Sequence, residues 1–308
     1  HRRLPGYAPS PLFALPGIAQ ALGIGQVWLK DESSRMGLPA FKILGASWAV
    51  IATIEEMLGI TTDAWASIDD LRALAEPLRP LTLACATDGN HGRAVARMAR
   101  WLGFSAIVLV PDDMAAVRRQ AIADEGAEVR IINGTYDDAI DASASLASER
   151  CVVISDTAWT GYEAIPRRVI EGYGTILAEL DAQLDGETIE LVAVPIGVGA
   201  LAAAVIGHFR GSDRSQQPLI AGVEPIRAAC MLESVVAGEP VVVPGPHTSI
   251  MSGLNCGIPS PLAWPIVSRG ADMFLTVGDE RVRAAMALLE TNGVVAGECG
   301  AAGLAGLL

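Results

Sequence analysis

The sequence is poor in charged residues and has no basic tract. Charged residues make up 19% of its 308 residues, whereas hydrophobic residues make up 51%. The net charge is −13 and no basic tract offsets it, so we expect neither a nucleic-acid partner nor binding to an anionic membrane surface. The composition predicts a well-packed globular chain, long enough for two lobes or one large α/β domain.

Cysteine is scarce and lacks the spacing of a metal site. The cysteines are odd in number, scattered and without any C-x-x-C pair: Cys85, Cys151, Cys230, Cys256 and Cys299. This pattern predicts reduced thiols in a cytoplasmic protein and no zinc site. We expect no other metal centre either.

No apolar run is long enough to cross a membrane. The longest, residues 191–207, is interrupted by Pro195, Gly197 and Gly199, and its pattern favours a strand, a turn and a helix. No signal-peptide pattern opens the sequence. We therefore expect no membrane partner.

Strand and helix patterns alternate along most of the chain. Short apolar stretches predict strands at residues 26–30, 82–85, 106–110, 128–132, 151–154, 191–195, 219–224 and 273–277. Longer stretches predict helices at 18–22, 61–80, 91–102, 113–125, 137–148, 162–183 and 200–209. Another helix is expected to follow residues 37–46 and to end at Ile54, and two more are expected at the end of the sequence. Such alternation is typical of parallel sheets with helices on their faces. Residues 239–266, rich in Pro, Gly and Ser, predict a long functional loop.

A polar turn at residues 87–92 separates one expected strand from the next helix. The N-terminus of a helix presents free N–H groups and a favourable dipole, so this turn could bind a carboxylate or a phosphate. The simpler interpretation is an ordinary helix cap provided by Thr87, Asp88 or Asn90. For the turn alone, the simpler interpretation is favoured.

A second glycine turn, at residues 195–200, also joins a strand to a helix. Its glycines would let the backbone approach a phosphate. Residues 197–202 also fit the dinucleotide fingerprint G-x-G-x-x-A, and Glu224 ends the next strand about where a ribose-binding acid would lie. A nicotinamide-dependent oxidoreductase is therefore a competing hypothesis, although it gives no role to the turn at 87–92. A solvated acid at a strand end is the simpler interpretation of Glu224.

Lys42 lies beside Phe41 in an apolar stretch. A lysine in such a place either extends its amine to solvent or is held with a lowered pKa as a nucleophile. Without other signals the first interpretation is favoured.

Three separated motifs together resemble one family. Residues 40–45, 87–92 and 197–200 resemble the fold-type II pyridoxal-phosphate enzymes, the tryptophan synthase β-subunit superfamily. Within it, Ala40, the pair Thr87–Asp88 and residues 155–162 look like the diaminopropionate ammonia-lyases. The resemblance covers nearly the whole chain. It also implies a strand beyond residues 301–304 with a Ser or Thr facing the pyridine nitrogen, and the sequence ends at Leu308, before that residue.

The resemblance implies a role for each matching residue. Lys42 would bind pyridoxal 5′-phosphate covalently, and Asn90 would hydrogen-bond its ring oxygen O3′. The phosphate would be bound by the backbone amides of Gly197, Val198, Gly199 and Ala200. The substrate carboxylate would be bound by the turn that contains Thr87, Asp88, Gly89 and His91.

Asp88 is informative because most relatives carry a small neutral residue beside the substrate carboxylate. Two adjacent carboxylates weaken binding unless a cation separates them, and a substrate with a second amine supplies that cation. Asp88 and Asp156 are then expected to receive the β-ammonium or to act as bases at Cα. The alternative for Asp156 is a helix cap, and the alternative for Tyr136, expected in the same pocket, is packing at a helix start. We expect His91 to anchor its turn rather than to act as a base, and Arg118 to lie on a solvated helix face.

The expected fold is a two-lobed α/β architecture of fold type II, with residues 1–52 and 153–308 in a large cofactor-binding lobe and 53–152 in a small lobe. Ligands in open α/β sheets bind at the carboxyl ends of strands, so cofactor and substrate are expected in the cleft. The expected reaction is the α,β-elimination of ammonia from 2,3-diaminopropionate, which yields pyruvate. The alternatives are a serine or threonine dehydratase-type lyase on the same fold and, more remotely, a nicotinamide-dinucleotide-binding protein. The family implies a homodimer.

Overall fold

The computed structural model describes residues 1–87, 89–134, 136–211 and 217–308, which form parallel sheets flanked by helices. This confirms the α/β fold class. The chain divides into two units, one with residues 1–8, 34–156 and 160–173, the other with residues 9–33, 157–159 and 174–308. The lobe ranges expected from the sequence stay a prediction. None of the helices in the described residues has both the length and the apolar character needed to cross a membrane.

The sheet of the first unit has the strand order β5-β4-β3-β6, with all neighbours parallel. Its strands are β3 (Thr82–Ala86), β4 (Ser105–Pro111), β5 (Glu128–Ile132) and β6 (Cys151–Val153). The two central strands, β3 and β4, are almost entirely buried, as is usual for a parallel sheet covered on both faces. Their apolar sequences follow from that burial.

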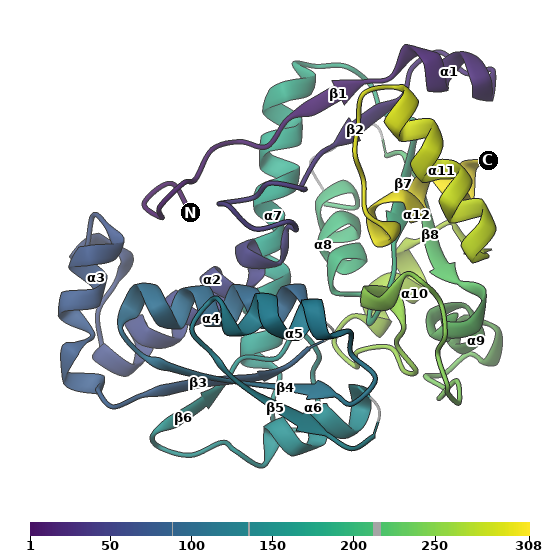
Figure 1. The fold of residues 1–308 in the computed structure, drawn as a ribbon. Coiled ribbons are helices and arrows are strands. Elements are labelled where there is room, and N and C mark those ends of the chain that lie inside the picture. The colour runs from purple at the N-terminus through teal and green to yellow at the C-terminus, as the bar shows by residue number, and fades with distance from the viewer. Residues whose placement is uncertain (88, 135, 212–216) are drawn as a thin grey trace. The chain divides into compact units, whose positions relative to one another are not determined.

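Helices cover both faces of this sheet. They are α2 (Lys42–Leu58), α3 (Ile68–Leu74), α4 (Asn90–Leu102), α5 (Ala116–Ala123) and α6 (Tyr136–Ala144). In Figure 1, α2 and α4 lie above the sheet and α6 lies below it. Residues 61–80 do not form one helix: a capping box of Ser67 and Asp70 starts α3 late, between the 3-10 helices η1 (Thr62–Ala64) and η2 (Glu76–Leu78).

The second unit contains a parallel sheet with the order β7-β8-β9. Its strands are β7 (Leu191–Pro195), β8 (Leu219–Pro225) and β9 (Met273–Val277). Its helices are α8 (Ala200–Phe209), α9 (Cys230–Ala237), α10 (Trp264–Gly270), α11 (Asp279–Thr291) and α12 (Glu298–Leu307), with 3-10 turns η3 (Ile226–Ala228) and η4 (Ser252–Leu254). The apolar helix α12 packs against all three strands and closes the core of the unit.

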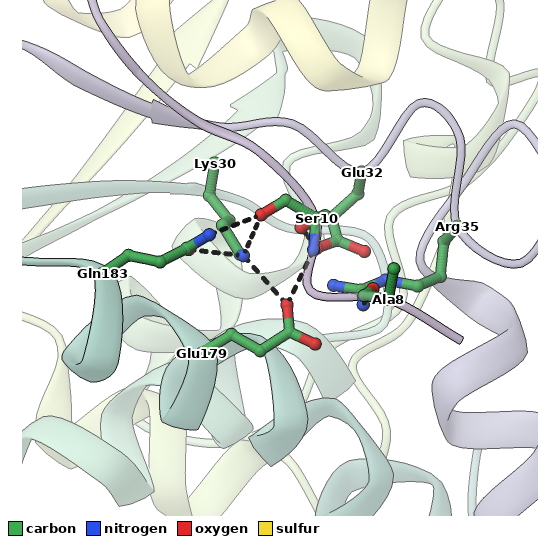
Figure 2. A network of polar contacts seen from close by, with 7 residues as sticks. All are labelled: Ala8, Ser10, Lys30, Glu32, Arg35, Glu179 and Gln183. Carbon is green, nitrogen blue, oxygen red and sulfur yellow. Dashed lines mark hydrogen bonds and ion pairs between the residues drawn. The ribbon is translucent and has the colours of Figure 1, made fainter. Parts of the chain in front are cut away.

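The second unit also holds an antiparallel pair, β1 (Leu12–Ala14) with β2 (Trp28–Lys30), joined through α1 (Pro16–Leu22). The division between the units falls inside α7 (Ala164–Leu184), after Tyr173. Lys30 fastens the antiparallel pair to the second half of α7 (Figure 2). Its Nζ donates to the Ser10 carbonyl oxygen (2.7 Å), Glu179 Oε2 (2.9 Å) and Gln183 Oε1 (2.8 Å). These acceptors match the three N–H groups of an ammonium, which allows Lys30 to be largely buried.

Candidate active site

The turn at residues 87–92 lies between β3 and α4 and is held by its own residues. The buried Thr87 hydroxyl accepts the N–H groups of Gly89 (2.9 Å) and Gly92 (3.0 Å). Gly89 has φ +142°, a conformation open to glycine, so a side chain there would strain the turn. A methyl group at Gly92 would lie 2.5 Å from Thr87 Cγ2 and 2.7 Å from Val108 Cγ1. The turn therefore requires glycine at both positions.

The first two amides of α4 are bonded to no acceptor among the described residues. Among the hydrogen bonds of the described residues, none uses the backbone N–H of Asn90 or His91. Because a helix N-terminus favours an anion, these donors fit the carboxylate expected at this turn. Asp88 lies outside the described residues, so its part in the site stays a prediction.

His91 ties this turn to the end of β6. Its Nε2 donates to the Ile154 carbonyl oxygen at 2.7 Å, and burial lowers the pKa of the ring, which is therefore neutral. The charges of Asp156 and Lys42 both act on it. The geometry matches the anchoring role expected from the sequence.

Lys42, Asp156 and Tyr136 come together within the first unit. Lys42, the first residue of α2, places its Nζ 2.7 Å from Asp156 Oδ2, and the Tyr136 hydroxyl at the start of α6 donates to Asp156 Oδ1 at 3.2 Å. Asp156 follows β6, and its side chain is 7% exposed, against 23% for Lys42. The carboxylate thus bonds to these two side chains, which favours a role in the site over the helix-cap interpretation.

The environment keeps Asp156 ionised. Burial on its own would raise the pKa of this carboxyl, but the Lys42 ammonium beside it, with the Tyr136 hydroxyl, holds the pKa well below its usual range. At neutral pH Asp156 is therefore a proton acceptor and a partner for cations. It cannot supply a proton to a leaving group.

The turn at residues 195–200 lies in the second unit, between β7 and α8, and forms a tight cradle of backbone. A methyl group at Gly197 would lie 3.0 Å from the Gly253 carbonyl oxygen and 3.2 Å from Cys256 Sγ, and one at Gly199 (φ +99°) would lie 2.8 Å from Met231 Cε. In the described part of the chain, no acceptor is bonded to the N–H groups from Gly197 to Ala200. Four unused amides at a helix N-terminus fit the phosphate of the expected cofactor.

The simpler interpretation of Glu224, a solvated acid at a strand end, is wrong because the residue is 0% exposed. Its carboxylate accepts the N–H groups of Met231 (2.8 Å) and Leu232 (2.9 Å) in the first turn of α9, and burial raises its pKa to about 7. The acid that the nicotinamide hypothesis assigns to a ribose therefore caps a helix. The described residues contain no group of three or more His, Cys, Asp or Glu side chains able to hold a metal ion.

Two residues near these groups do not follow from the motifs. Tyr173 of α7 places its ring centre 6.0 Å from Lys42 Nζ. Its position between Gly172 and Gly174 was the sequence signal that could have revealed this contact, because glycine inside a helix often marks a close approach. Arg118, expected on a solvated face, is half-buried, and its Cδ lies 3.8 Å from where a methyl group at Gly89 would be.

Comparison with known proteins identifies several relatives. A family model described as pyridoxal-phosphate dependent enzyme matches residues 3–308. The chain is 37% identical to the diaminopropionate ammonia-lyase of Salmonella typhimurium, covering 100% of this chain and 79% of that protein. It superposes on a crystal structure of Escherichia coli diaminopropionate ammonia lyase in complex with D-serine with a TM-score of 0.92 and 35% identity, covering 100% of this chain and 78% of that one. An L-threonine dehydratase of Mycobacterium bovis is 32% identical but covers 73% of this chain and 52% of that protein.

Proposed function

Because the chain belongs to the pyridoxal-phosphate dependent enzyme family, we propose that it eliminates ammonia from 2,3-diaminopropionate. In the net reaction, one diaminopropionate and one water give one pyruvate and two ammonia. The full-length similarity to diaminopropionate ammonia-lyases supports this substrate over threonine, since the threonine dehydratase matches a smaller part of the chain. The observation that carries the proposal is the buried, ionised Asp156 beside the Lys42 amine.

The residues present fit the cofactor. Lys42 would hold it covalently, the four amides from Gly197 to Ala200 would bind its phosphate, and Asn90 would hydrogen-bond O3′. When bound, the cofactor withdraws the electron pair left at Cα when the proton is removed. The N–H groups of the turn at 87–92 would bind the substrate carboxylate, because the positive end of the helix dipole attracts an anion there.

The protonation state of Asp156 explains why the leaving group is an amine. A hydroxyl leaves readily only when an acid protonates it, and Asp156 carries no proton at neutral pH. A β-ammonium already carries its proton and leaves as neutral ammonia. Asp156 would bind this ammonium or remove the Cα proton, with Tyr136 fixing the orientation of the carboxylate. A serine dehydratase-type reaction would need a proton donor in its place.

The test is a substrate panel on the purified protein supplied with pyridoxal 5′-phosphate. The D and L isomers of 2,3-diaminopropionate and of serine, together with L-threonine, are compared by the 2-oxo acid and the ammonia that they release. We expect pyruvate from diaminopropionate with two ammonia for each pyruvate. Faster pyruvate release from serine, or 2-oxobutyrate from threonine as the main product, would establish the dehydratase alternative instead.

A matched pair of variants separates the role of Lys42 from that of a lysine in general. Lys30 and Lys42 are the only lysines of the sequence. Lys42→Ala should abolish both the visible absorbance of the bound cofactor and the elimination. Lys30→Arg keeps a cation in the network of Figure 2 and should retain both. Loss of the absorbance band in the second variant but not in the first would contradict the assignment.

We also propose that the protein is a cytoplasmic homodimer. The family resemblance supports the dimer, and the thiol state of all five cysteines supports a reducing compartment. Sedimentation of the purified protein tests the first part. Fractionation of cells that express it tests the second.

A further inference from the structure

The chain immediately before Asp156 is the end of an edge strand. β6 pairs with β3 on one side, and no strand of the described residues pairs with its other side. Successive residues of a strand direct their backbone groups to opposite sides. Ile154 donates its N–H to the Ala84 carbonyl oxygen of β3 at 2.7 Å. The backbone groups of Val153 and Ser155 therefore face the open edge, where they need another partner.

Tyr162 supplies a partner at this edge. Its hydroxyl donates to the Val153 carbonyl oxygen at 2.6 Å and accepts the Ser155 N–H at 3.0 Å. One residue of a parallel neighbouring strand would bond to the same carbonyl and to the same N–H. Burial raises the pKa of the Tyr162 hydroxyl, so the group keeps its proton and can donate and accept at the same time. Phenylalanine would fill the same space and make neither contact.

The other side of the same stretch is bonded to the turn at residues 87–92. His91 Nε2 donates to the Ile154 carbonyl oxygen at 2.7 Å, and β3 accepts the N–H of the same residue. All of these residues belong to the first unit. The backbone that leads to Asp156 is therefore bonded on both sides, by Tyr162 at the open edge and by His91 and β3 at the other.

The place of the Asp156 carboxylate depends on this backbone. Its Oδ2 lies 2.7 Å from Lys42 Nζ, and its Oδ1 accepts the Tyr136 hydroxyl at 3.2 Å. A displacement of about 1 Å in a reacting group can lower a rate by about 100-fold. The two contacts of Tyr162 are to backbone, next to the residue whose carboxylate reaches the lysine. Tyr162 can therefore influence a reaction at Lys42 by fixing the place of Asp156.

We propose that Tyr162 is a positioning residue for Asp156: its hydroxyl takes the place of a residue in a neighbouring strand and fixes the backbone from which the carboxylate reaches Lys42. The inference rests on the proposed function, because the consequence that it assigns to Tyr162 concerns the elimination in which Asp156 takes part. It gives a reason for a hydroxyl at a place where packing alone would accept phenylalanine.

Amide hydrogen exchange on the full chain tests the anchoring without any reaction. Tyr162→Phe removes the hydroxyl that accepts the Ser155 N–H and leaves the bond from the Ile154 N–H to β3 in place. We expect the Ser155 amide to exchange at least about tenfold faster in the variant and the Ile154 amide to keep its rate. Mass spectrometry with fragmentation to single residues measures both rates. An unchanged Ser155 rate, or an equal acceleration of both amides, would overturn the inference.

A double-mutant cycle distinguishes positioning from a general loss of stability. It measures kcat/KM with 2,3-diaminopropionate for the natural protein, Tyr162→Phe, Asp156→Asn and the double variant. We expect Tyr162→Phe alone to lower kcat/KM by about 10- to 100-fold. In the Asp156→Asn protein the same change should lower kcat/KM by less than about threefold, because no carboxylate is left to be misplaced. No fall in the single variant, or an equal fall in both proteins, would overturn the inference.

Ser234→Ala is the matched control. The Ser234 hydroxyl makes the same two kinds of contact at the same distances, in the second unit. It donates to the Cys230 carbonyl oxygen at 2.6 Å and accepts the Val241 N–H at 3.0 Å. Both variants should lower the melting temperature, but Ser234→Ala should keep kcat/KM within about threefold of the natural value. A fall as large as that of Tyr162→Phe would overturn the inference, because the loss of any buried backbone contact would then have the same effect.

These tests fail independently of the proposed function. If the natural chain acts on diaminopropionate but the Ser155 exchange or the cycle gives the contrary result, the positioning role is wrong and the function stands. If the chain acts on serine instead, the proposed function is wrong, and the cycle measured with serine decides on Tyr162. If no substrate reacts, the function is wrong, and the exchange rates alone decide whether Tyr162 fixes the backbone before Asp156.

Discussion

Asp156→Asn tests the chemistry of the site because it removes one charge and almost no volume. The carboxylate lies 2.7 Å from Lys42 Nζ and 3.2 Å from the Tyr136 hydroxyl, and its side chain is 7% exposed. Loss of a positioned proton acceptor typically lowers a rate by about 10²- to 10⁴-fold. We expect kcat/KM with 2,3-diaminopropionate to fall by this factor, which corresponds to a loss of about 3–5 kcal/mol of transition-state stabilisation.

The assay measures pyruvate release from the D and L isomers separately. Because Asp88 and Asp156 are both expected bases and could serve different faces of Cα, we expect Asp156→Asn to reduce the rate with one isomer more than with the other. Equal loss with both isomers would indicate that Asp156 binds the β-ammonium, which the isomers share. Rates within about threefold of the natural protein for both isomers would refute the role given to Asp156.

The same variant has a signature in stability. Removing one partner of a buried ion pair costs about 3–5 kcal/mol, and the partial exposure of Lys42 places the expected loss near the lower value. The pKa of Asp156 is lowered by folding, so its contribution is complete above the ordinary carboxyl pKa of about 4 and is lost as the pH falls below it. The melting temperatures of the cofactor-free variant and the natural protein should therefore differ at pH 7 and converge in acid.

Three further changes test other parts of the structure. Lys30→Met leaves the Glu179 carboxylate buried without its ammonium and should lower the free energy of unfolding by about 3–5 kcal/mol, measured by urea denaturation. Burial raises the pKa of Glu224 to about 7, so the stability that this acid contributes is complete below the ordinary value of about 4.5 and is lost as the pH rises to about 7. Glu224→Gln should remove this pH dependence of the melting temperature, which melting curves across that range detect. Gly92→Ala places a methyl group 2.5 Å from Thr87 Cγ2 and should destabilise by about 1–3 kcal/mol while weakening substrate binding, measured as a raised KM.

Two of these changes have a control variant within the chain. Arg130→Met breaks an exposed pair with Glu128 and should leave the free energy of unfolding nearly unchanged, because water screens exposed ion pairs. An equally small effect of Lys30→Met would show that burial does not strengthen the Lys30–Glu179 pair. Gly174→Ala adds a methyl group with nothing within 4 Å inside α7 and should stabilise by about 0.5–1 kcal/mol, in contrast to Gly92→Ala. An unaltered pH profile in Glu224→Gln would contradict the raised pKa of Glu224.

Local patterns predicted the strands that form the parallel sheets. The expected strands at 128–132, 191–195 and 273–277 match β5, β7 and β9 because each is a short apolar run bounded by turn residues. α9 was not predicted, since its first turn depends on the buried carboxylate of Glu224 rather than on its own sequence. The loop expected over residues 239–266 ends earlier than predicted, where α10 begins at Trp264.

The two turns of the candidate site could be predicted because each is a short stretch between a strand and a helix. The contacts between distant residues could not. Lys42 and Asp156 are 114 residues apart, and no spacing rule joins them. Tyr173 reaches Lys42 through the crossing of α2 and α7, which depends on Gly45 and Gly172 in different segments. Such pairs are set by packing, and a single sequence does not reveal packing.

The most direct test of the account is the identity of the lysine that holds the cofactor. Borohydride treatment of the loaded protein fixes pyridoxal 5′-phosphate to its lysine, and peptide mass spectrometry then distinguishes Lys42 from Lys30, the only other lysine. We predict the added mass on the Lys42 peptide alone. The added mass on Lys30, or on neither lysine, would contradict the account.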